Sequence, residues 1–503
     1  MNLASFKVTR NTIIVLLDFV SYGALNYAFW FVLARITSLE VSGGVATIFS
    51  IITIGSLISL GIPIATSKYV SEHLSRQNPI IVRAIIKSAI NLALSLSIIA
   101  SVLLVLFAER IARIYEVPGI TTPLRVSALL ILLYPVLEVL SGVYQGFQKM
   151  EYCFVQALFE AGSKFFLGLG LVLLGFGVIG PVLGMIIGWF SAIILALFFI
   201  PRLLRQTQDF QFHPSENDPE MYFFKWTDLI RLGMPNFIIY GVIKLSSQAG
   251  TLILGLFERS FVSVALYYLS LQITLGLTMI SEALGIALLP AVSNAWVKKS
   301  THEFGSTLNL CVRYFFVITS PIVIISFFFP EEIILLILGK AYLPAVSMLR
   351  ILLLAIPAIG MLQIFVSVLT GIGSTKRLIF ISFILLILYF PLAFILTNIY
   401  GLIGTSGAFT CSMTIGALVT FWMTQKATKM HIDLMILAKI LVPSTVFLLS
   451  TIILTSLSLS FLLALFLGFT IYLILSFVIG TITREDIAFL KNLLRMLAGN
   501  PNE

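Results

Sequence analysis

The 503-residue chain carries little charge. Charged residues make up 11% of the sequence, against roughly 25% in soluble domains, while hydrophobic residues make up 59% and the mean hydropathy is +1.08. This composition excludes a soluble globular protein and predicts an integral membrane protein. At about 20 apolar residues per span, the length allows a dozen or more helices and leaves no room for a large soluble domain.

Cysteine and histidine are also scarce. The three cysteines lie far apart inside predicted spans, which disfavours a disulfide framework or a CxxC metal site. The four histidines lie in predicted loops without metal-ligand spacing, and there is no Gly-Lys-Ser/Thr phosphate loop. We therefore expect no cofactor, no metal site and no ATP hydrolysis, and we expect that the protein is not an enzyme.

The net charge of +9 does not indicate nucleic-acid binding, because the basic residues lie between apolar runs rather than on one tail or helix. Their distribution follows topology instead. With the N-terminus in the cytoplasm, about 21 Lys and Arg fall on the inner side of the membrane and about seven on the outer side. This positive-inside pattern predicts a multi-pass protein of the cytoplasmic membrane with both termini in the cytoplasm.

An internal repeat at a spacing of about 224 residues is the most informative feature that is present. Two copies of one membrane unit are typical of carriers whose similar halves close alternately on either side of a central site. The repeated landmarks are Arg125, Gly146, Gly177 and Gly180 in the first copy and Arg350, Gly371, Gly401 and Gly404 in the second.

The apolar windows predict an all-α polytopic membrane protein of about 14 transmembrane helices, arranged as two pseudo-symmetric six-helix lobes plus two C-terminal helices. The connector between the lobes is placed in the only sustained hydrophilic passage. The expected regions are an N-terminal lobe (1–200), a cytoplasmic connector (201–236), a C-terminal lobe (237–430), two extra spans (431–483) and a cytoplasmic amphipathic tail (484–503).

Ionisable residues at bilayer depth are costly unless they face a cavity or a partner, so each is a candidate for function. Lys244 is a candidate to meet an anionic headgroup. Asp18 is a candidate to hold Lys244 in place or to take up a proton or a sodium ion, and a salt bridge between these two without a ligand is the alternative. The expected substrate-binding residues are Asp18, Arg35, Lys68, Lys244, Glu138 and Glu282.

Two further points bear on these candidates. Arg35 and Lys68 lie at span ends, where extension of the side chain to the interface is the alternative to substrate binding. Glu160 and Lys164 are four residues apart on one predicted helix, so they are expected to neutralise each other. Several aromatic residues could stack on sugar rings or serve only in packing, namely Tyr22, Tyr27, Trp30, Tyr240, Tyr267 and Tyr268.

With two six-helix lobes, a polar connector, two extra C-terminal spans and Gly-x-Ile-Gly turns at Gly177 and Gly401, the chain resembles the polysaccharide transporter branch of the multidrug/oligosaccharidyl-lipid/polysaccharide exporter superfamily. The resemblance covers residues 6–482. It implies a V-shaped bundle that flips a polyprenyl phosphate- or pyrophosphate-linked oligosaccharide across the cell membrane by alternating access, for cell-surface polysaccharide or glycoprotein glycan synthesis. Lys244, Arg35 and Lys68 would supply cations for the phosphate.

The expected partners are the lipid-linked oligosaccharide and membrane lipids, with a coupling proton or sodium ion and glycan-assembly enzymes as further candidates. We expect a monomer and no nucleic acid. Two other functions stay open. A cation-coupled drug or small-molecule exporter of the same superfamily would usually have twelve spans, and a membrane-embedded glycan polymerase or ligase would need a large outer loop.

Overall fold

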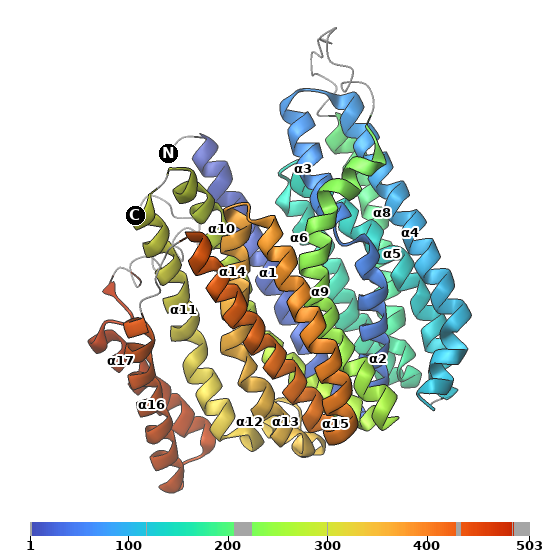
Figure 1. The fold of residues 1–503 in the computed structure, drawn as a ribbon. Helices are drawn as coiled ribbons and strands as arrows, with labels where there is room; N and C mark the ends of the chain where they lie inside the picture. Colours follow the sequence, from blue (N-terminus) through green and yellow to red (C-terminus); the bar gives the residue numbers. More distant parts are fainter. Residues whose placement is uncertain are drawn as a thin grey trace. The chain divides into compact units, whose positions relative to one another are not determined.

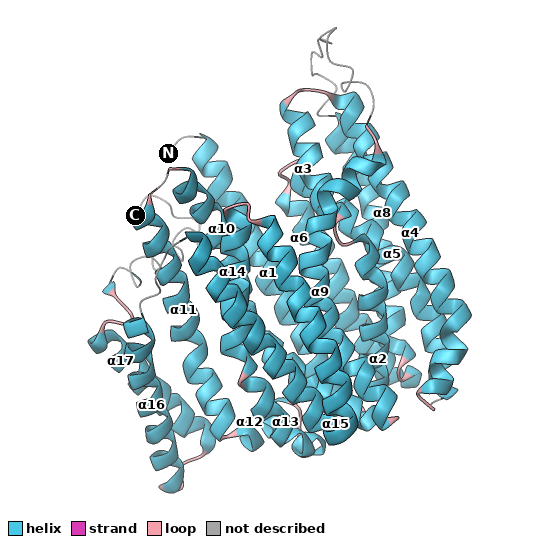
Figure 2. Ribbon diagram, in the orientation of Figure 1, coloured by secondary structure: helices cyan, strands magenta, loops and turns pink. Residues whose placement is uncertain are grey.

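The computed structural model describes residues 3–116, 118–205, 224–298, 300–428, 434–484 and 486, with side chains described from Val20 onward except at a few helix positions. Within these residues the chain is helical almost throughout and contains no strand (Figure 2). The predicted all-α class is therefore confirmed. By its contacts the chain divides into two units, which we describe separately.

Unit 1 comprises residues 1–272 and 382–409. Its central helix is α5, which packs against α3, α4 and α8 (Figure 1). It also holds the first part of α10 (Phe261–Val297) and the middle of α15 (Thr375–Thr428). Its other helices are α1 (Leu3–Ile36), α2 (Leu39–Ser56), α3 (Ile62–Ser75), α4 (Pro79–Ile114), α5 (Thr121–Gly146), α6 (Met150–Ser163), α7 (Leu169–Leu171), α8 (Ile179–Arg205) and α9 (Trp226–Glu258).

Unit 2 comprises residues 273–381 and 410–503. Besides the remaining parts of α10 and α15, it contains α11 (Thr301–Phe328), α12 (Pro330–Ile337), α13 (Val346–Leu353), α14 (Ala355–Gly371), α16 (Leu434–Ser456) and α17 (Phe461–Ile479). The two predicted extra spans correspond to α16 and α17, which pack on each other, and α16 packs on α11. Tyr472 of α17 donates a hydrogen bond to the carbonyl oxygen of Val317 at 2.6 Å.

The described residues contain ten helices long and apolar enough to cross a membrane, or eleven if a bent pair near α13 and α14 is one span. The expected number of fourteen is therefore not confirmed. The difference arises partly at α15, a 54-residue element that counts once but includes a kink at Gly401 between two predicted spans. The predicted lobe boundary at 201–236 lies largely outside the described residues and stays a prediction.

Glycines of the repeat create matching kinks. Gly177 has φ 52° and ψ −130°, and Gly401 has φ 54° and ψ −128°, a conformation that is essentially closed to residues with a Cβ. Two spans of each copy meet at this turn. The repeat in the sequence is therefore also a repeat of backbone geometry.

The span that begins with α2 is broken rather than kinked by proline. The α-helix ends at Ser56, a 3-10 turn η1 (Leu57–Ser59) follows, and Pro63 stands in the first turn of α3, where its missing N–H costs nothing. Gly142 of α5 then packs directly on the backbone of Pro63, because a Cβ there would collide with the Pro63 carbonyl. This close contact is the packing role expected for such glycines.

Candidate functional site

A group of polar side chains gathers inside unit 1, in spans that are otherwise apolar. We call it the unit 1 polar cluster. Ionisable groups at this depth are rare because each one must be matched by a partner or a wet cavity. The cluster consists of Tyr22 and Asn26 on α1, Tyr134 and Glu138 on α5, Glu160 on α6, Lys164 at the start of segment η3 (Lys164–Gly168), and Lys244 on α9.

Lys164 is the most deeply buried cation of the cluster, with 6% of its surface exposed. Its Nζ donates a hydrogen bond to Asn26 Oδ1 at 2.6 Å. The same nitrogen lies 4.5 Å from the ring centre of Phe29, 5.1 Å from that of Trp30 and 4.6 Å from that of Phe49. Three aromatic faces and one amide oxygen thus replace the water around the ammonium group, an arrangement in which cation–π attraction reaches about 2 kcal/mol or more.

The local backbone places this lysine. At Lys164 the chain changes from α-helix to a π-helical turn, in which hydrogen bonds join residues five apart and the helix is wider. On the other side of the turn, α8 approaches closely through Gly184 and Gly188, where a Cβ would meet the backbone of Gly168 or the side chain of Ser163. The widened turn and the glycine face together allow η3 to pack tightly on α8, while side chains of α1 and α2 enclose the Lys164 ammonium group.

Glu160 has a different partner. Its carboxylate accepts a hydrogen bond from the Tyr22 hydroxyl at 3.1 Å, so the two residues predicted to neutralise each other both bond to neutral groups of α1. The carboxylate of Glu138 and the ammonium groups of Lys164 and Lys244 lie close enough to act electrostatically on Glu160. The balance of the cluster is two carboxylates and two ammonium groups.

The exposure of the charges differs across the cluster. Glu138 and Glu160 are half-buried, whereas Lys244 is exposed and Lys164 is enclosed. Tyr134 lies beside both carboxylates, with its ring 5.3 Å from that of Trp189. Carboxylates and a phenol can hydrogen-bond to sugar hydroxyls, and an exposed ammonium group can attract a phosphate. The enclosed Lys164 compensates the negative charge of the carboxylates.

The residues predicted from the sequence do not all come together. Of the six expected substrate-binding residues, Glu138 and Lys244 belong to the cluster. Arg35 is exposed in the last turn of α1, and Lys68 is exposed on α3. Glu282 is exposed on α10 and belongs to unit 2. Asp18 lies in α1, but its side chain is outside the described residues.

Asn26, Phe29 and Phe49 were not predicted as site residues, whereas Trp30 was named as an aromatic residue that stacks on a sugar ring or serves only in packing. A signal for Asn26 is present in the sequence, because Asn26 follows Tyr22 by four residues in an apolar helix, which places both on one face. The partnership with Lys164 has no such signal. It joins residues 138 positions apart and depends on how α1 packs against α6 and η3.

A half-buried ion pair in unit 2 joins α11 to the segment that follows α17. Arg313 of α11 donates to Asp486 Oδ1 at 2.7 Å, and the Tyr314 hydroxyl donates to the same oxygen at 2.5 Å. Asp486 Oδ2 accepts from the backbone N–H of Thr483 at 2.7 Å. Burial opposes ionisation of Asp486, but these hydrogen bonds and the Arg313 charge together hold its pKa below the ordinary value of 3.8.

The Ile114 end of α4 and the Glu258 end of α9 are joined within unit 1. Tyr115, 5% exposed, fits against Gly255, where a Cβ would collide with the tyrosine ring, and its hydroxyl donates to the Leu252 carbonyl at 3.0 Å. Next to it, Glu116 and Arg259 form an exposed ion pair. The two helix ends are thus held by one buried ring and one surface contact.

No metal centre accompanies these groups in the part of the chain that the structure describes, where no three His, Cys, Asp or Glu side chains are placed to hold an ion.

Comparison with known families places this geometry in context. The profile of the family described as polysaccharide biosynthesis protein matches residues 8–296, more than half of the chain, and the MatE profile matches residues 235–395. An uncharacterized membrane protein of Methanocaldococcus jannaschii is 25% identical over 409 residues, which cover 80% of this chain and 94% of that protein. A Shigella flexneri protein assigned to O-antigen transport is 25% identical over 175 residues, 33% of this chain and 41% of that protein.

Solved structures show the same fold. The lipid II flippase MurJ in an inward closed conformation is similar with a TM-score of 0.69 at 17% identity, over 93% of this chain and 98% of that chain. An inward-facing multidrug resistance MATE family transporter of the MOP superfamily has a TM-score of 0.66 at 14% identity, over 83% and 98%. The fold is that of multi-pass membrane transporters of the multidrug/oligosaccharidyl-lipid/polysaccharide exporter superfamily.

Within this superfamily, the chain belongs to the polysaccharide biosynthesis protein family, the polysaccharide transporter branch. The resemblance noted from the sequence is confirmed.

Proposed function

We propose that the protein flips a lipid-linked oligosaccharide, carried on a polyprenyl phosphate or pyrophosphate, across the cell membrane by alternating access. The observation that carries the proposal is the unit 1 polar cluster in a chain of the polysaccharide biosynthesis family. A substrate of this class needs a cation for its phosphate and hydrogen-bonding groups for its sugars. The exposed Lys244 beside Glu160 offers the first, and Tyr22, Tyr134 and the two carboxylates offer the second.

In this proposal an incoming phosphate replaces Glu160 as the partner of Lys244. The exchange is electrostatically balanced because Lys164 remains beside the carboxylate. The protein would lie in the cytoplasmic membrane with both termini inside, as the distribution of basic residues predicts. The two predicted lobes would rock around the site.

The test is reconstitution into liposomes with a fluorescent polyprenyl-pyrophosphate oligosaccharide, whose accessibility to a quencher reports flipping. We expect wild-type protein to accelerate exchange between leaflets and Lys244→Ala to abolish the acceleration. Lys426→Ala is the control, because Lys426 is an exposed lysine that stacks on Trp422 in unit 2, away from the cluster. A Lys244→Ala protein that flips at the wild-type rate would remove Lys244 from the site.

Charge reversal at Asp18, by Asp18→Lys, extends the same assay to the coupling ion. We expect impaired flipping if Asp18 holds Lys244 or takes up a proton or sodium ion, and normal flipping marks it as structural. Repeating the wild-type assay with and without a pH or sodium gradient then separates ion-coupled from uncoupled transport.

A cation-coupled small-molecule exporter is the second candidate, favoured by the MatE profile match over residues 235–395. The two extra C-terminal spans predicted from the sequence, which correspond to α16 and α17, support the first candidate. Proteoliposomes loaded with a cationic dye distinguish the two functions. Gradient-driven dye efflux without lipid exchange would favour the exporter.

A further inference from the structure

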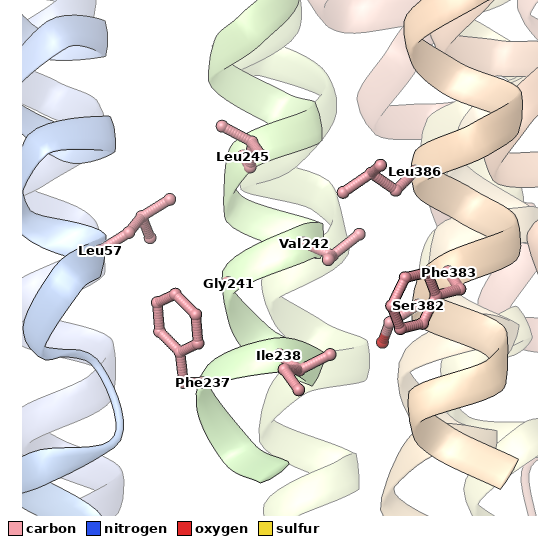
Figure 3. Close-up of a pocket in the computed structure, with 9 residues that line it drawn as sticks. All are labelled: Leu57, Phe237, Ile238, Gly241, Val242, Leu245, Ser382, Phe383 and Leu386. Carbon is pink, nitrogen blue, oxygen red and sulfur yellow. The ribbon is translucent and has the colours of Figure 1, made fainter. Parts of the chain in front are cut away.

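An apolar pocket of about 260 Å³ opens in unit 1 between α2, α9 and α15 (Figure 3). Leu57 at the end of α2 faces Phe237 and Gly241 of α9, and Val242 of α9 faces the α15 residues 382–386. Among the described residues of the lining, Ser382 carries the only polar side chain. Phe383, 56% exposed, marks the side on which the pocket meets the surroundings of the helices.

Two contacts between α9 and the stretch from α2 to the start of α3 bracket the pocket along α9. At one point, Gly61, just before α3, and Gly233 bring the two backbones into direct contact, since a Cβ on Gly61 would collide with the Gly233 carbonyl. At the other point, Ser50 donates a hydrogen bond to the Gln248 side chain at 3.0 Å. Gly233 and Gln248 are about 22 Å apart along α9 at 1.5 Å per residue.

The break in the helix after Ser56 places Leu57 of the 3-10 turn η1 on the wall of the pocket. Gly241 on the opposite helix has no side chain to fill the gap, and a Cβ there would find its nearest neighbours at 3.9 Å, an ordinary contact distance. The result is a slot bracketed by the two contacts and lined by hydrocarbon.

The chemistry of the slot selects a hydrocarbon chain. It offers almost no hydrogen-bonding groups to a sugar, and its volume is below the roughly 300–1,000 Å³ typical of small-molecule sites. Inside a bilayer, however, an apolar pocket gains little from hydrophobicity alone, because lipid tails are as apolar as the pocket. Selectivity must therefore come from a polar group attached to the chain.

Lys244 supplies that selectivity. Lys244 follows Gly241 by three residues. Residues at this spacing are neighbours on the surface of a helix, with about 5–6 Å between their Cβ positions. The exposed ammonium group of Lys244 lies at the edge of the unit 1 polar cluster, near Glu160. A molecule with an anionic group at the head of a single hydrocarbon chain matches both features, the chain to the slot and the phosphate to Lys244.

We propose that this slot holds the first isoprenoid units of the lipid carrier while Lys244 binds its phosphate; the inference rests on the proposed function and names the part of its site that receives the lipid. A polyprenyl phosphate has one chain per phosphate. A membrane phospholipid has two chains on one headgroup. A slot bracketed by two helix contacts accommodates two chains less well than one. The slot thus favours the carrier over the surrounding lipids.

The experiment uses full-length protein in nanodiscs with two photoactivatable probes, a polyprenyl monophosphate without sugar and a phosphatidylglycerol, each with a diazirine near the headgroup. We expect the polyprenyl probe to label peptides containing Leu57, residues 237–245 or residues 382–386. Gly241→Phe should fill the slot and lower this labelling about tenfold, a change of ~1.4 kcal/mol in binding. Gly407→Phe is the control, because no atom lies within 4 Å of a Cβ at Gly407.

Three results would overturn the proposal: equal labelling by the phosphatidylglycerol probe, polyprenyl labelling confined to other helices, or unchanged labelling in Gly241→Phe. If Gly241→Phe does not fold, competition on the wild type decides. Unlabelled polyprenyl phosphate must reduce the labelling, and unlabelled phosphatidylglycerol must not. A protein that is labelled in the slot but does not flip oligosaccharide contradicts the proposed function alone, whereas flipping with labelling elsewhere contradicts this inference alone.

Discussion

The two copies of the repeat share a scaffold but differ in charge. Gly177 and Gly401 adopt the same backbone conformation to within a few degrees, and each joins two spans of its own copy. Gly146 packs on Val70, and its counterpart Gly371 packs on Val292. The residues that set helix contacts and turns are therefore present in both copies.

Most of the polar cluster comes from the first copy, and Lys244 is its one member from the second copy, predicted at 237–430. Positions 224 or 225 residues after Glu138, Glu160 and Lys164 hold no charge at all; they are Leu362 or Gln363, Ile384 or Leu385, and Leu388 or Tyr389. The two copies therefore share a frame, whereas the charged side chains of the cluster come mainly from the first copy.

The largest loss of stability and of flipping should follow when the charge of Lys164 is replaced by an apolar side chain, as at the corresponding position of the second copy. Lys164→Met removes the ammonium group from the aromatic faces and leaves Asn26 without its partner, so we expect a loss of about 3 kcal/mol of unfolding free energy. Flipping should fall at least about tenfold, because the carboxylates lose their enclosed counter-charge. Thermal unfolding in detergent and the liposome assay measure the two effects.

The matched control is Leu388→Met at the corresponding position of the second copy. A swap of similar volume between apolar residues should cost less than about 1.5 kcal/mol and leave flipping intact. Equal losses of stability and flipping in the two variants would show that the difference in charge between the copies does not matter for function.

The next effect separates charge from hydrogen bonding at Glu160. Glu160→Gln keeps an acceptor for the Tyr22 hydroxyl but removes the negative charge that faces Lys164 and Lys244. We expect flipping to fall about tenfold with a change in stability below ~1 kcal/mol. Tyr22→Phe keeps the charge and loses the hydrogen bond, so it should flip nearly normally. A Tyr22→Phe protein that is more impaired than Glu160→Gln would contradict the role given to the charge.

A smaller effect tests the shared scaffold. Alanine at either kink glycine is forced into a conformation that costs about 1–3 kcal/mol. Gly401→Ala and Gly177→Ala should cost about the same, because a Cβ at Gly401 meets only the end of the exposed Glu258 side chain, which can move aside, and a Cβ at Gly177 has no atom within 4 Å. Thermal unfolding measures both losses. Gly170→Ala, in open space, is the reference, and a loss at the kink glycines no larger than that at Gly170 would contradict this prediction.

The smallest effect concerns the ion pair of unit 2, which joins Arg313 of α11 to Asp486, after α17. Because the pKa of Asp486 is lowered by folding, the stabilisation is fully present above the ordinary value of 3.8 and is lost as the pH falls through the lower folded value. Asp486→Asn should therefore cost about 1 kcal/mol at pH 7 and nothing at the acid end. Unfolding curves of both proteins that stay parallel down to pH 3 would contradict this assignment.

The sequence was sufficient for features with local causes. Long apolar runs predict helices because the bilayer leaves no alternative for the backbone, and the paired Gly-x-Ile-Gly turns predict matching kinks because only glycine adopts them. Helix α17 (Phe461–Ile479) lies within one predicted extra span, and α16 begins a few residues before the other.

Features set by packing between distant segments were not predictable in the same way. A spacing of four residues suggested that Glu160 pairs with Lys164, but a π-helical turn begins at Lys164, and α1 supplies separate partners to each. Which of several similar apolar helices becomes the neighbour depends on side-chain fit that no short pattern records.

The joined ends of α4 and α9 have an energetic consequence. An exposed ion pair such as Glu116–Arg259 contributes at most about 1 kcal/mol, so most of the hold rests on the Tyr115 ring and its single hydrogen bond to the Leu252 carbonyl, which together are worth a few kcal/mol at most. A fastening of that strength is within reach of the free energy that one charged headgroup gains on binding. If these ends separate in the proposed flipping cycle, binding of the substrate headgroup would supply enough free energy to open them.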